Sequence, residues 1–417
     1  MTAHRMVAVR NSVPRIAASR VVTPLWRPAR FASWGPVADE IREIGSLPGA
    51  NWVRLRNVQC GICATDVAFL NARVDPSISV AALPGREEIF LGHELVAVVE
   101  EVGAGVSRVE PGDRVILDTR FQGATCATAE ADPWCARCAD GDFMLCENPD
   151  RLDAAPLVGG GWGTGLACHE FEIYPCPPGL SDDRAMLVEP LSLGVRAVGK
   201  SGSPQLSNAL VIGSGMAGMA IVCALRSLHP ECAITVVARH ERQAALASEF
   251  GAAHIARAMD PEELASQAGA RLYKRPFGAW FAMGGFDCVF DTVGSKKTID
   301  TALRLSRAGG RAVLVGISLE RTNVDLSPLW HQEVSVAGVL AHGCEHGGSQ
   351  PMHTYDMVID RVFDSGCAVE KLITDRFAFD DWKSAVGRSE QRADGVVRVG
   401  LDIEARSGPR SPSNAPN

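Results

Sequence analysis

The stretch ALVIGSGMAGMAIVCALRSL, residues 209–228, decides the fold of this chain. Its first four residues form a continuous apolar run typical of a buried β-strand, and residues 216–228 have the pattern of a helix. The glycines between them form G-x-G-x-x-G, which permits a tight turn and close approach of the backbone to a pyrophosphate at the helix N-terminus. Because the pattern lies between a strand and a helix, it predicts a dinucleotide-binding loop. The loop residues are Gly213, Gly215, Met216, Ala217 and Gly218.

Further strands and helices alternate downstream of this loop. Strands are expected at residues 233–238, 286–294, 311–317 and 334–340, and a helix over 241–251 should end at Gly251. Continuous apolar strands that alternate with helices predict a parallel sheet covered on both faces, a doubly wound α/β domain. We assign this domain to residues 193–343.

The end of the second strand of this domain bears on the choice of cofactor. A site selective for NAD usually has an acidic residue there, which binds the ribose 2′-hydroxyl. This chain has Ala238, followed by Arg239 and Arg242. Guanidinium groups suit phosphate oxygens, so NADP is favoured and NAD is the alternative. The two arginines could also be solvated residues at the start of a helix.

Composition restricts the possible classes of function. The 417 residues have a formal net charge of −8, which favours neither nucleic acid nor an anionic membrane. No apolar run approaches the roughly 20 residues of a membrane-spanning helix. The 13 cysteines accompany no secretory pattern, so we expect reduced thiols, some of them metal-bound, in a cytoplasmic protein.

Both ends of the chain are unusual in composition. The first 33 residues contain six arginines and no acidic residue, which fits either an organellar transit peptide or a loose arm. The arm is favoured because lysine is scarce along the whole chain. Residues 406–417 are polar and rich in Pro and Ser, and they are expected to form a disordered tail.

The part of the chain before the dinucleotide loop has a different pattern. Residues 51–120 show short β segments separated by Gly and Pro, and residues 121–165 form a Cys-, Asp- and Gly-rich stretch without periodicity. We therefore expect a mainly β domain over residues 1–192, to which the chain returns over 344–405. In the stretch GGGWGTG, residues 159–165, Trp162 could cover a substrate or could be a packing residue in a surface loop.

Three short motifs in this first domain carry residues that bind metals. GICATD contains Cys63, GHE contains His93 and Glu94, and VEPLS contains Glu189. A catalytic zinc site takes about three protein ligands of these types and keeps one position open for water or substrate. Each motif is weak alone, but their order ahead of a dinucleotide fold, together with PGDRV at 111–115, predicts a catalytic metal site.

With these motifs, residues 50–400 resemble the zinc-dependent alcohol dehydrogenases of the medium-chain dehydrogenase/reductase superfamily. VEPLS makes the resemblance strongest to the branch that acts on polyols, sugars and threonine. The resemblance implies a GroES-like catalytic domain beside a Rossmann domain. It also implies that Cys63 and His93 bind zinc, and that Glu94 and Glu189 ligate or approach it. Asp66 would orient the histidine, and Thr65 would pass the substrate proton toward solvent.

The same resemblance bears on the stretch DPWCARCADGDFMLC, residues 132–146. The second zinc site of the family uses four cysteines, of which the first three are each separated by two residues and the last follows after seven. Cys135, Cys138 and Cys146 match that spacing, and the missing position falls on Asp132. A carboxylate can ligate zinc, so Asp132 is the favoured fourth ligand and Cys126 is its rival.

The expected function is therefore hydride transfer between NAD(P) and a secondary alcohol, polyol or sugar-like substrate, with zinc as the second cofactor. The alternative is a metal-independent enone or quinone reductase, or a non-redox protein such as a lyase, on the same fold. The predicted zinc ligands argue against both of these alternatives. The resemblance and the apolar strands that end the nucleotide sheet predict a homodimer or homotetramer.

Overall fold

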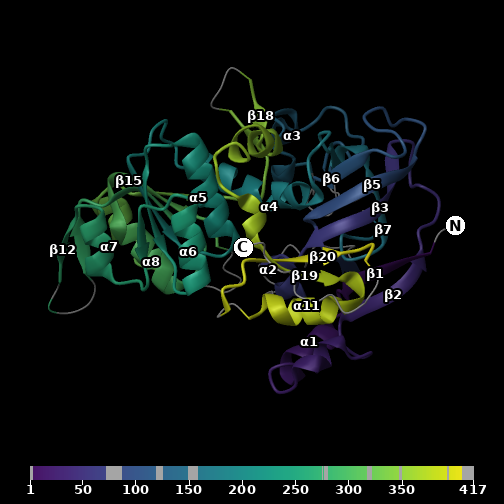
Figure 1. Ribbon diagram of the computed structural model, residues 1–417, viewed down its shortest axis with the longest axis horizontal. Helices are drawn as coiled ribbons and strands as arrows, with labels where there is room; N and C mark the ends of the chain where they lie inside the picture. Colours follow the sequence, from purple (N-terminus) through teal and green to yellow (C-terminus); the bar gives the residue numbers. More distant parts are fainter. Residues whose placement is uncertain are drawn as a thin grey trace, which may run out of the picture.

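The computed structural model describes residues 3–71, 87–118, 125–148, 158–274, 276, 280–316, 322–346, 350–391 and 394–405. The expected disordered tail, residues 406–417, lies outside the described residues. The chain forms a nucleotide-type α/β unit and a mainly β unit that lie side by side (Figure 1).

The α/β unit is built on a six-stranded sheet in the order β11-β10-β9-β14-β15-β16. Every neighbouring pair in this sheet is parallel. From β9 the chain continues to β10 and β11 on one side of the sheet, and it then continues from β14 to β16 on the other side. The order of the strands therefore changes direction between β9 and β14, and a ligand crevice is expected at that point. The strands are β9 (Asn208–Ile212), β10 (Ala233–Val237), β11 (His254–Ala256), β14 (Phe286–Asp291), β15 (Ser306–Leu314) and β16 (Ser335–Gly338).

Helices cover both faces of this sheet (Figure 1). Val211 of β9 points into one core with α5, whereas Leu210 and Ile212 point into a second core with α7 and α8. This alternation follows from the period of two along a strand. The helices of the unit are α5 (Met216–Leu228), α6 (Glu241–Glu249), α7 (Pro261–Gln267), α8 (Lys296–Leu305) and α9 (Ser327–His331), and β12 (Arg271–Tyr273) pairs with β13 (Phe281–Met283).

The mainly β unit contains a seven-stranded sheet in the order β19-β20-β3-β5-β6-β8, in which β7 also pairs with β3. Its core includes Leu55, Leu95 and Leu166, all fully buried. The strands are β3 (Trp52–Gly61), β5 (Leu95–Val102), β6 (Arg114–Leu117), β7 (Gly165–His169), β8 (Ile173–Pro175), β19 (Ile373–Ala378) and β20 (Arg398–Asp402). Short helical segments include α2 (Ala64–Leu70), α3 (Ala136–Ala139), η4 (Phe143–Leu145) and η6 (Glu170–Glu172).

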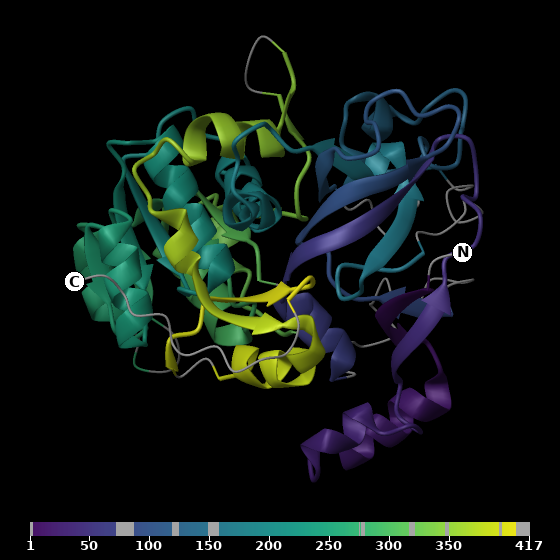
Figure 2. The same ribbon diagram turned by 45° about the vertical axis from the view of Figure 1, so that its right-hand side comes forward.

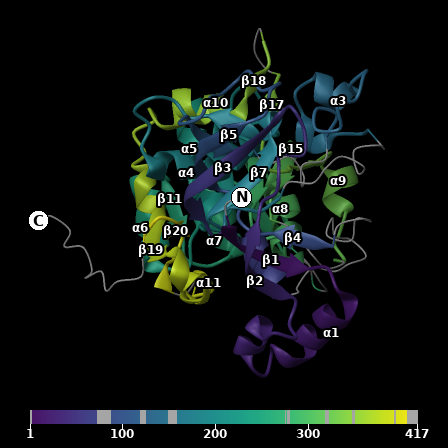
Figure 3. The same ribbon diagram turned by 90° about the vertical axis from the view of Figure 1, so that its right-hand side faces the viewer.

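The N-terminal segment is not the loose arm that its composition suggested. β1 (Ala3–Arg10) lies between β2 (Val37–Glu43) and β4 (Glu88–Phe90) in a three-stranded sheet, and its Val7 is fully buried. Alternate apolar side chains in this strand bury themselves in the core, which composition alone does not reveal. Between β1 and β2, α1 (Val13–Val22) projects from the body of the protein (Figures 2 and 3). The following η1 (Arg27–Phe31) packs against the body, where the ring centroid of Phe31 lies 5.2 Å from that of Trp382.

One long helix joins the two units. α4 (Asp182–Gly199) packs on α5 of the nucleotide unit and also contacts β3, β5 and β6 of the β unit. The predicted boundary at residue 193 falls inside this helix. None of the described helices is both long enough and apolar enough to cross a membrane.

The chain returns from the nucleotide sheet through a short hairpin, β17 (Cys344–Glu345) and β18 (Met352–His353), which stands at the top of Figure 1. Three helical segments then pack on α4 or α5 before β19 enters the large sheet, namely α10 (Thr354–Met357), η7 (Val358–Val362) and η8 (Val369–Leu372). Between β19 and β20 lie η9 (Phe379–Asp381) and α11 (Trp382–Ser389), and α11 packs on both strands.

Candidate functional site

Three of the predicted metal ligands meet at the edge of the large sheet. Cys63 is the N-cap of α2, directly after β3, and His93 and Glu94 lie between β4 and β5. Their ligand atoms all lie within 4.8 Å of one another. Antiparallel pairing of β3 with β5 brings these two chain segments together. The structure therefore assembles Cys63, His93 and Glu94 into one cluster.

Asp66 holds this cluster in place. Its Oδ2 accepts a hydrogen bond from the backbone N–H of Cys63 at 3.2 Å, and its Oδ1 accepts one from Gly92 N–H at 3.0 Å. Oδ1 also lies 3.5 Å from Nδ1 of His93. A carboxylate beside Nδ1 favours the tautomer whose Nε2 is left to bind a metal. Burial lowers the pKa of His93, but the negative charges of Asp66 and Cys63 outweigh it and hold that pKa well above its usual range.

Arg398, which the sequence did not indicate, forms an ion pair with Glu94. Nη2 of Arg398, in β20, lies 2.9 Å from Oε1 of Glu94, and both side chains are buried. Burial raises the pKa of Glu94, while the charge of Arg398 opposes that rise. A Cβ on Gly61 would lie 2.0 Å from Oε2 of Glu94, so any side chain there would displace the Glu94 carboxylate. The sequence signal that could have identified Arg398 is its charge at the start of RVGLD, residues 398–402, because a charged residue is rarely buried in a strand without a partner.

Glu189 and Thr65 lie around the cluster. Glu189 is buried in α4, outside the group of three ligand atoms, and its charge interacts with His93 and Glu94. Burial raises the pKa of Glu189 to about 7, and His93 opposes this. Oγ1 of Thr65 lies 3.7 Å from Sγ of Cys63. All the predicted residues are therefore near one another, with Glu94 rather than Glu189 in the tight cluster.

The glycine loop has the form that a bound dinucleotide requires. Gly213 adopts φ +105°, which favours glycine, and a Cβ there would lie 2.4 Å from Thr292 Oγ1. A Cβ on Gly218 would lie 2.0 Å from the carbonyl oxygen of Gly213, so α5 packs too closely on the loop for any side chain. A Cβ on Gly215, the N-cap of α5, would meet nothing within 4 Å. This open space at the helix N-terminus is where a pyrophosphate would be held.

The residues expected to bind the ribose of the cofactor follow β10. Ala238 is fully buried, whereas Arg239 and Arg242 are exposed. Nη2 of Arg242 lies 3.5 Å from the carbonyl oxygen of Thr374, and the carbonyl of Arg239 accepts a hydrogen bond from Arg257. The guanidinium of Arg239 is therefore at the surface, beside the end of the strand that borders the dinucleotide crevice.

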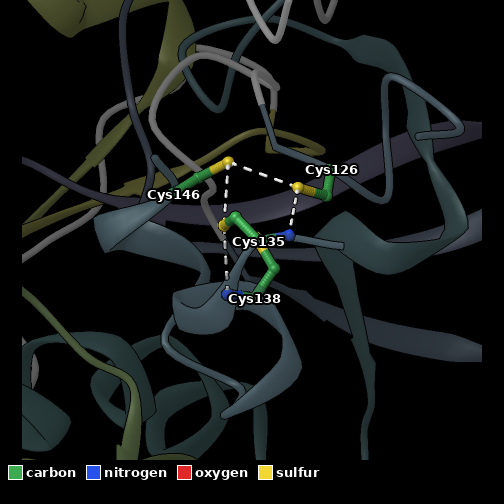
Figure 4. Close-up of side chains that lie close together, drawn as sticks. All are labelled: Cys126, Cys135, Cys138 and Cys146. Atoms are coloured by element: carbon green, nitrogen blue, oxygen red, sulfur yellow. Dashed lines mark hydrogen bonds between the residues drawn. The ribbon is translucent and has the colours of Figure 1, made fainter. Parts of the chain in front are cut away.

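Four cysteines form a second cluster (Figure 4). Sγ of Cys146 lies 3.8 Å from Sγ of Cys126 and 4.0 Å from Sγ of Cys135, and Cys138 completes a group within 4.8 Å. Sulfur atoms that each lie about 2.3 Å from one tetrahedral zinc ion are about 3.8 Å apart, so the spacing fits zinc. Burial opposes ionisation of Cys135, but N–H groups of Cys138 and Glu147 outweigh it and lower its pKa to about 6.

This arrangement corrects the predicted ligand set, because Cys126 and not Asp132 completes the group. Asp132 is exposed, whereas Cys126 is fully buried. The reason is a local turn in which Thr125 and Thr128 exchange hydrogen bonds and Ala131 N–H donates to the Cys126 carbonyl. The turn folds Cys126 back onto the other three cysteines, so the regular spacing counted along the chain does not identify the fourth member of the group.

Trp162 packs inside the protein and does not cover a substrate. Its side chain is fully buried, its ring centroid lies 6.0 Å from that of Trp382, and its Nε1 donates to the Gly61 carbonyl at 3.3 Å. The Trp162 side chain therefore contacts the backbone two residues before Cys63.

Two protein-family models match this chain. Residues 49–178 match the alcohol dehydrogenase GroES-like domain, and residues 217–358 match the zinc-binding dehydrogenase family. The chain belongs to the zinc-dependent alcohol dehydrogenases of the medium-chain superfamily. It is therefore an oxidoreductase of that family, with zinc and a nicotinamide dinucleotide as cofactors.

Named relatives of this medium-chain dehydrogenase act on polyols and sugar acids. It is 29% identical over 333 residues to a sorbitol dehydrogenase of Arabidopsis thaliana, covering 79% of this chain and 82% of that protein. It is 27% identical over 327 residues to an L-idonate 5-dehydrogenase of Vitis vinifera, covering 78% and 81%. The crystal structure of galactitol-1-phosphate dehydrogenase from Escherichia coli has the same fold, with a TM-score of 0.70, 18% identity, and coverage of 96% and 100%.

Proposed function

We propose that this dehydrogenase interconverts a secondary alcohol of a polyol or sugar-like substrate and the corresponding ketone, with NADP favoured over NAD. The cluster of Cys63, His93 and Glu94 carries the proposal, because it offers one thiolate, one imidazole and one carboxylate within 4.8 Å. These are ligand types that catalytic zinc takes. The names of the curated relatives support the polyol class of substrate.

We assign the roles of the individual residues on the contacts described above. Cys63 and His93 would hold the ion, and Asp66 would keep Nε2 of His93 free to bind it. Glu94 and Glu189 would approach the ion from the buried side, with Arg398 compensating the charge of Glu94. Thr65, beside Cys63, would pass the substrate hydroxyl proton toward solvent.

When bound, zinc supplies a Lewis acid that lowers the pKa of the substrate alcohol, and the nicotinamide supplies the hydride acceptor. The open space at Gly215 would hold the cofactor pyrophosphate on the backbone N–H groups of α5. Arg239 and Arg242 would bind the 2′-phosphate of NADP, since Ala238 stands where a site selective for NAD usually has a carboxylate.

We further propose that the four-cysteine cluster holds a second, structural zinc ion. Four thiolates close the coordination sphere, so this ion would hold the loop together and take no part in hydride transfer. All 13 cysteines are free thiols, and a cytoplasmic location, where thiols remain reduced, fits this chemistry.

We also propose that the protein is a homodimer or homotetramer. β16 ends the six-stranded sheet, and its Val336 side chain is 42% exposed. An apolar edge strand in this state invites pairing with an equivalent strand of a second chain.

The test is a turnover screen against polyols, sugars and amino alcohols, with NADP and NAD in parallel. Cys63→Ser should abolish turnover and remove one zinc ion while the circular dichroism spectrum stays unchanged. Cys60→Ser is the matched control, because Cys60 is a buried thiol three residues away that lies outside the cluster. Full turnover in Cys63→Ser, or no oxidation of any polyol by the wild-type enzyme, would contradict the proposal.

A further inference from the structure

A third group of potential metal ligands lies apart from both zinc clusters. Asp118 directly follows β6, His342 precedes β17, and His353 is the last residue of β18. Their ligand atoms all lie within 4.8 Å of one another. Asp118 is distant in sequence from the two histidines, which flank one hairpin, and none of the three belongs to the Cys63 cluster or the four-cysteine cluster.

The distances within this group match a coordination sphere. Nδ1 of His342 lies 3.2 Å from Oδ1 of Asp118, and Nε2 of His353 lies 3.7 Å from Oδ2 of Asp118. Two ligand atoms that each lie about 2.1 Å from a tetrahedral ion are about 3.4 Å apart. The two observed separations, each to a different oxygen of Asp118, fall on either side of that value. One ligand atom from each residue lies within 4.8 Å of the others, so an ion fits among the three side chains with small side-chain movements.

All three side chains of this group are largely buried. The side chains of Asp118 and His342 are 4% and 1% exposed, and that of His353 is 14% exposed. A carboxylate taken out of water is strongly destabilised unless a cation compensates it. A divalent ion supplies that charge and leaves both imidazoles neutral, which is the state in which histidine binds metals.

The surrounding aromatic side chains fix the two histidines. The ring centroid of Tyr355 lies 5.0 Å from that of His342 and 4.9 Å from that of His353, and the Tyr355 hydroxyl donates to the Leu117 carbonyl at 3.0 Å. The N–H of Thr354 donates to the Gly343 carbonyl at 2.8 Å, which ties together the chain next to each histidine. The ligands are thus held by their own neighbours, as a metal site requires.

We propose that Asp118, His342 and His353 form a third metal site, which takes a divalent transition-metal ion such as Zn²⁺. Two imidazoles and one carboxylate suit zinc and the neighbouring divalent metals, and they leave at least one position for water. The ion would connect the end of β6 in the β unit with the β17–β18 hairpin that follows the nucleotide sheet. Its role is to fix these two segments against each other.

One contact in the metal-free protein would change when the ion binds. Nδ1 of His353 accepts a hydrogen bond from Tyr355 N–H at 3.3 Å, so the neutral ring carries its proton on Nε2. Coordination through Nε2 moves that proton to Nδ1 and breaks this hydrogen bond. Zinc binding at the third site should therefore be weaker than at the thiolate clusters, and it should weaken further as the pH falls.

The experiment uses the absence of sulfur from the third site. The full-length enzyme is saturated with Zn²⁺, desalted and treated with an organomercurial, which releases zinc from thiolates. About one zinc ion per chain should remain bound by atomic emission. Release of all the zinc would overturn the proposal and would mean that the three side chains form only a hydrogen-bonded network.

Variants then assign the remaining ion to these residues. His342→Gln and Asp118→Asn keep the size of each side chain and should each remove the mercurial-resistant zinc. His254→Gln is the matched control, because His254 is exposed at the start of β11, and it should retain that ion. Mercurial-resistant zinc that persists in folded His342→Gln would also overturn the proposal.

Discussion

Replacement of Cys126 tests the second zinc site most sharply, because the sequence and the structure favour different fourth ligands. Cys126→Ser removes a fully buried thiol whose Sγ lies 3.8 Å from Sγ of Cys146 and accepts a hydrogen bond from Cys135 N–H at 3.3 Å. The three remaining thiolates would share the ion with water or with a weakly bound hydroxyl. We expect the affinity for zinc to fall.

The size of this effect follows from the ligand count. Structural zinc sites bind with about 10–16 kcal/mol of free energy, so one ligand of four contributes roughly 2.5–4 kcal/mol. At 1.4 kcal/mol per factor of ten, Cys126→Ser should raise the zinc dissociation constant about a hundredfold to a thousandfold. Because metal binding is coupled to folding of the loop, the temperature midpoint should fall and protease cleavage should appear around the cluster.

The assay is competition for zinc with a chromogenic chelator, combined with thermal unfolding. Asp132→Ala is the comparison variant, because Asp132 is exposed and should lose neither zinc nor stability. Cys176→Ser controls for loss of a thiol outside the cluster. If Asp132→Ala released the zinc while Cys126→Ser kept it, the placement of Cys126 in the site would be wrong.

Three further outcomes are expected. Arg239→Ala should raise KM for NADP by about tenfold to a hundredfold and change KM for NAD little, because a hydrogen bond to a charged group contributes about 1.5–3 kcal/mol; equal changes for both cofactors would argue against contact with the 2′-phosphate. Gly215→Ala should leave the unfolding temperature unchanged, since its Cβ meets no protein atom within 4 Å, and it should weaken cofactor binding in a fluorescence titration. Gly218→Ala should instead destabilise the fold, because its Cβ would lie 2.0 Å from a backbone oxygen. Val336→Lys, at the exposed edge β16, should shift the protein to monomers in light scattering, and unchanged oligomers would place the interface elsewhere.

Local patterns in the sequence predicted the nucleotide fold well. The helix expected over residues 216–228 runs from Met216 to Leu228, and the strand expected at 233–238 forms β10. These elements combine a clear apolar period with glycines whose roles are steric, so each local signal agrees with the final fold. The GHE motif likewise lies beside Cys63, because β3 and β5 pair.

Contacts between distant segments could not be predicted in this way. Cys126 was ranked below Asp132 because ligand spacing was counted along the chain, and a turn between Thr125 and Ala131 invalidates that count. Asp118 and His342 share no spacing pattern at all and meet only through the packing of β6 against the segment before β17. Such sites depend on tertiary structure, which a one-dimensional pattern does not contain.

The ion pair between Glu94 and Arg398 has a consequence for how this protein is made. Arg398 lies in β20, which enters the sheet next to β3 more than 300 residues after Glu94 has been synthesised. Chains fold from the N-terminus as they leave the ribosome. Until β20 pairs with β3, the carboxylate of Glu94 lacks this cation, and its burial is unfavourable. The cluster of Cys63, His93 and Glu94 therefore gains this cation only after β20 has been synthesised and has paired with β3, which couples its assembly to the last strand to enter the large sheet.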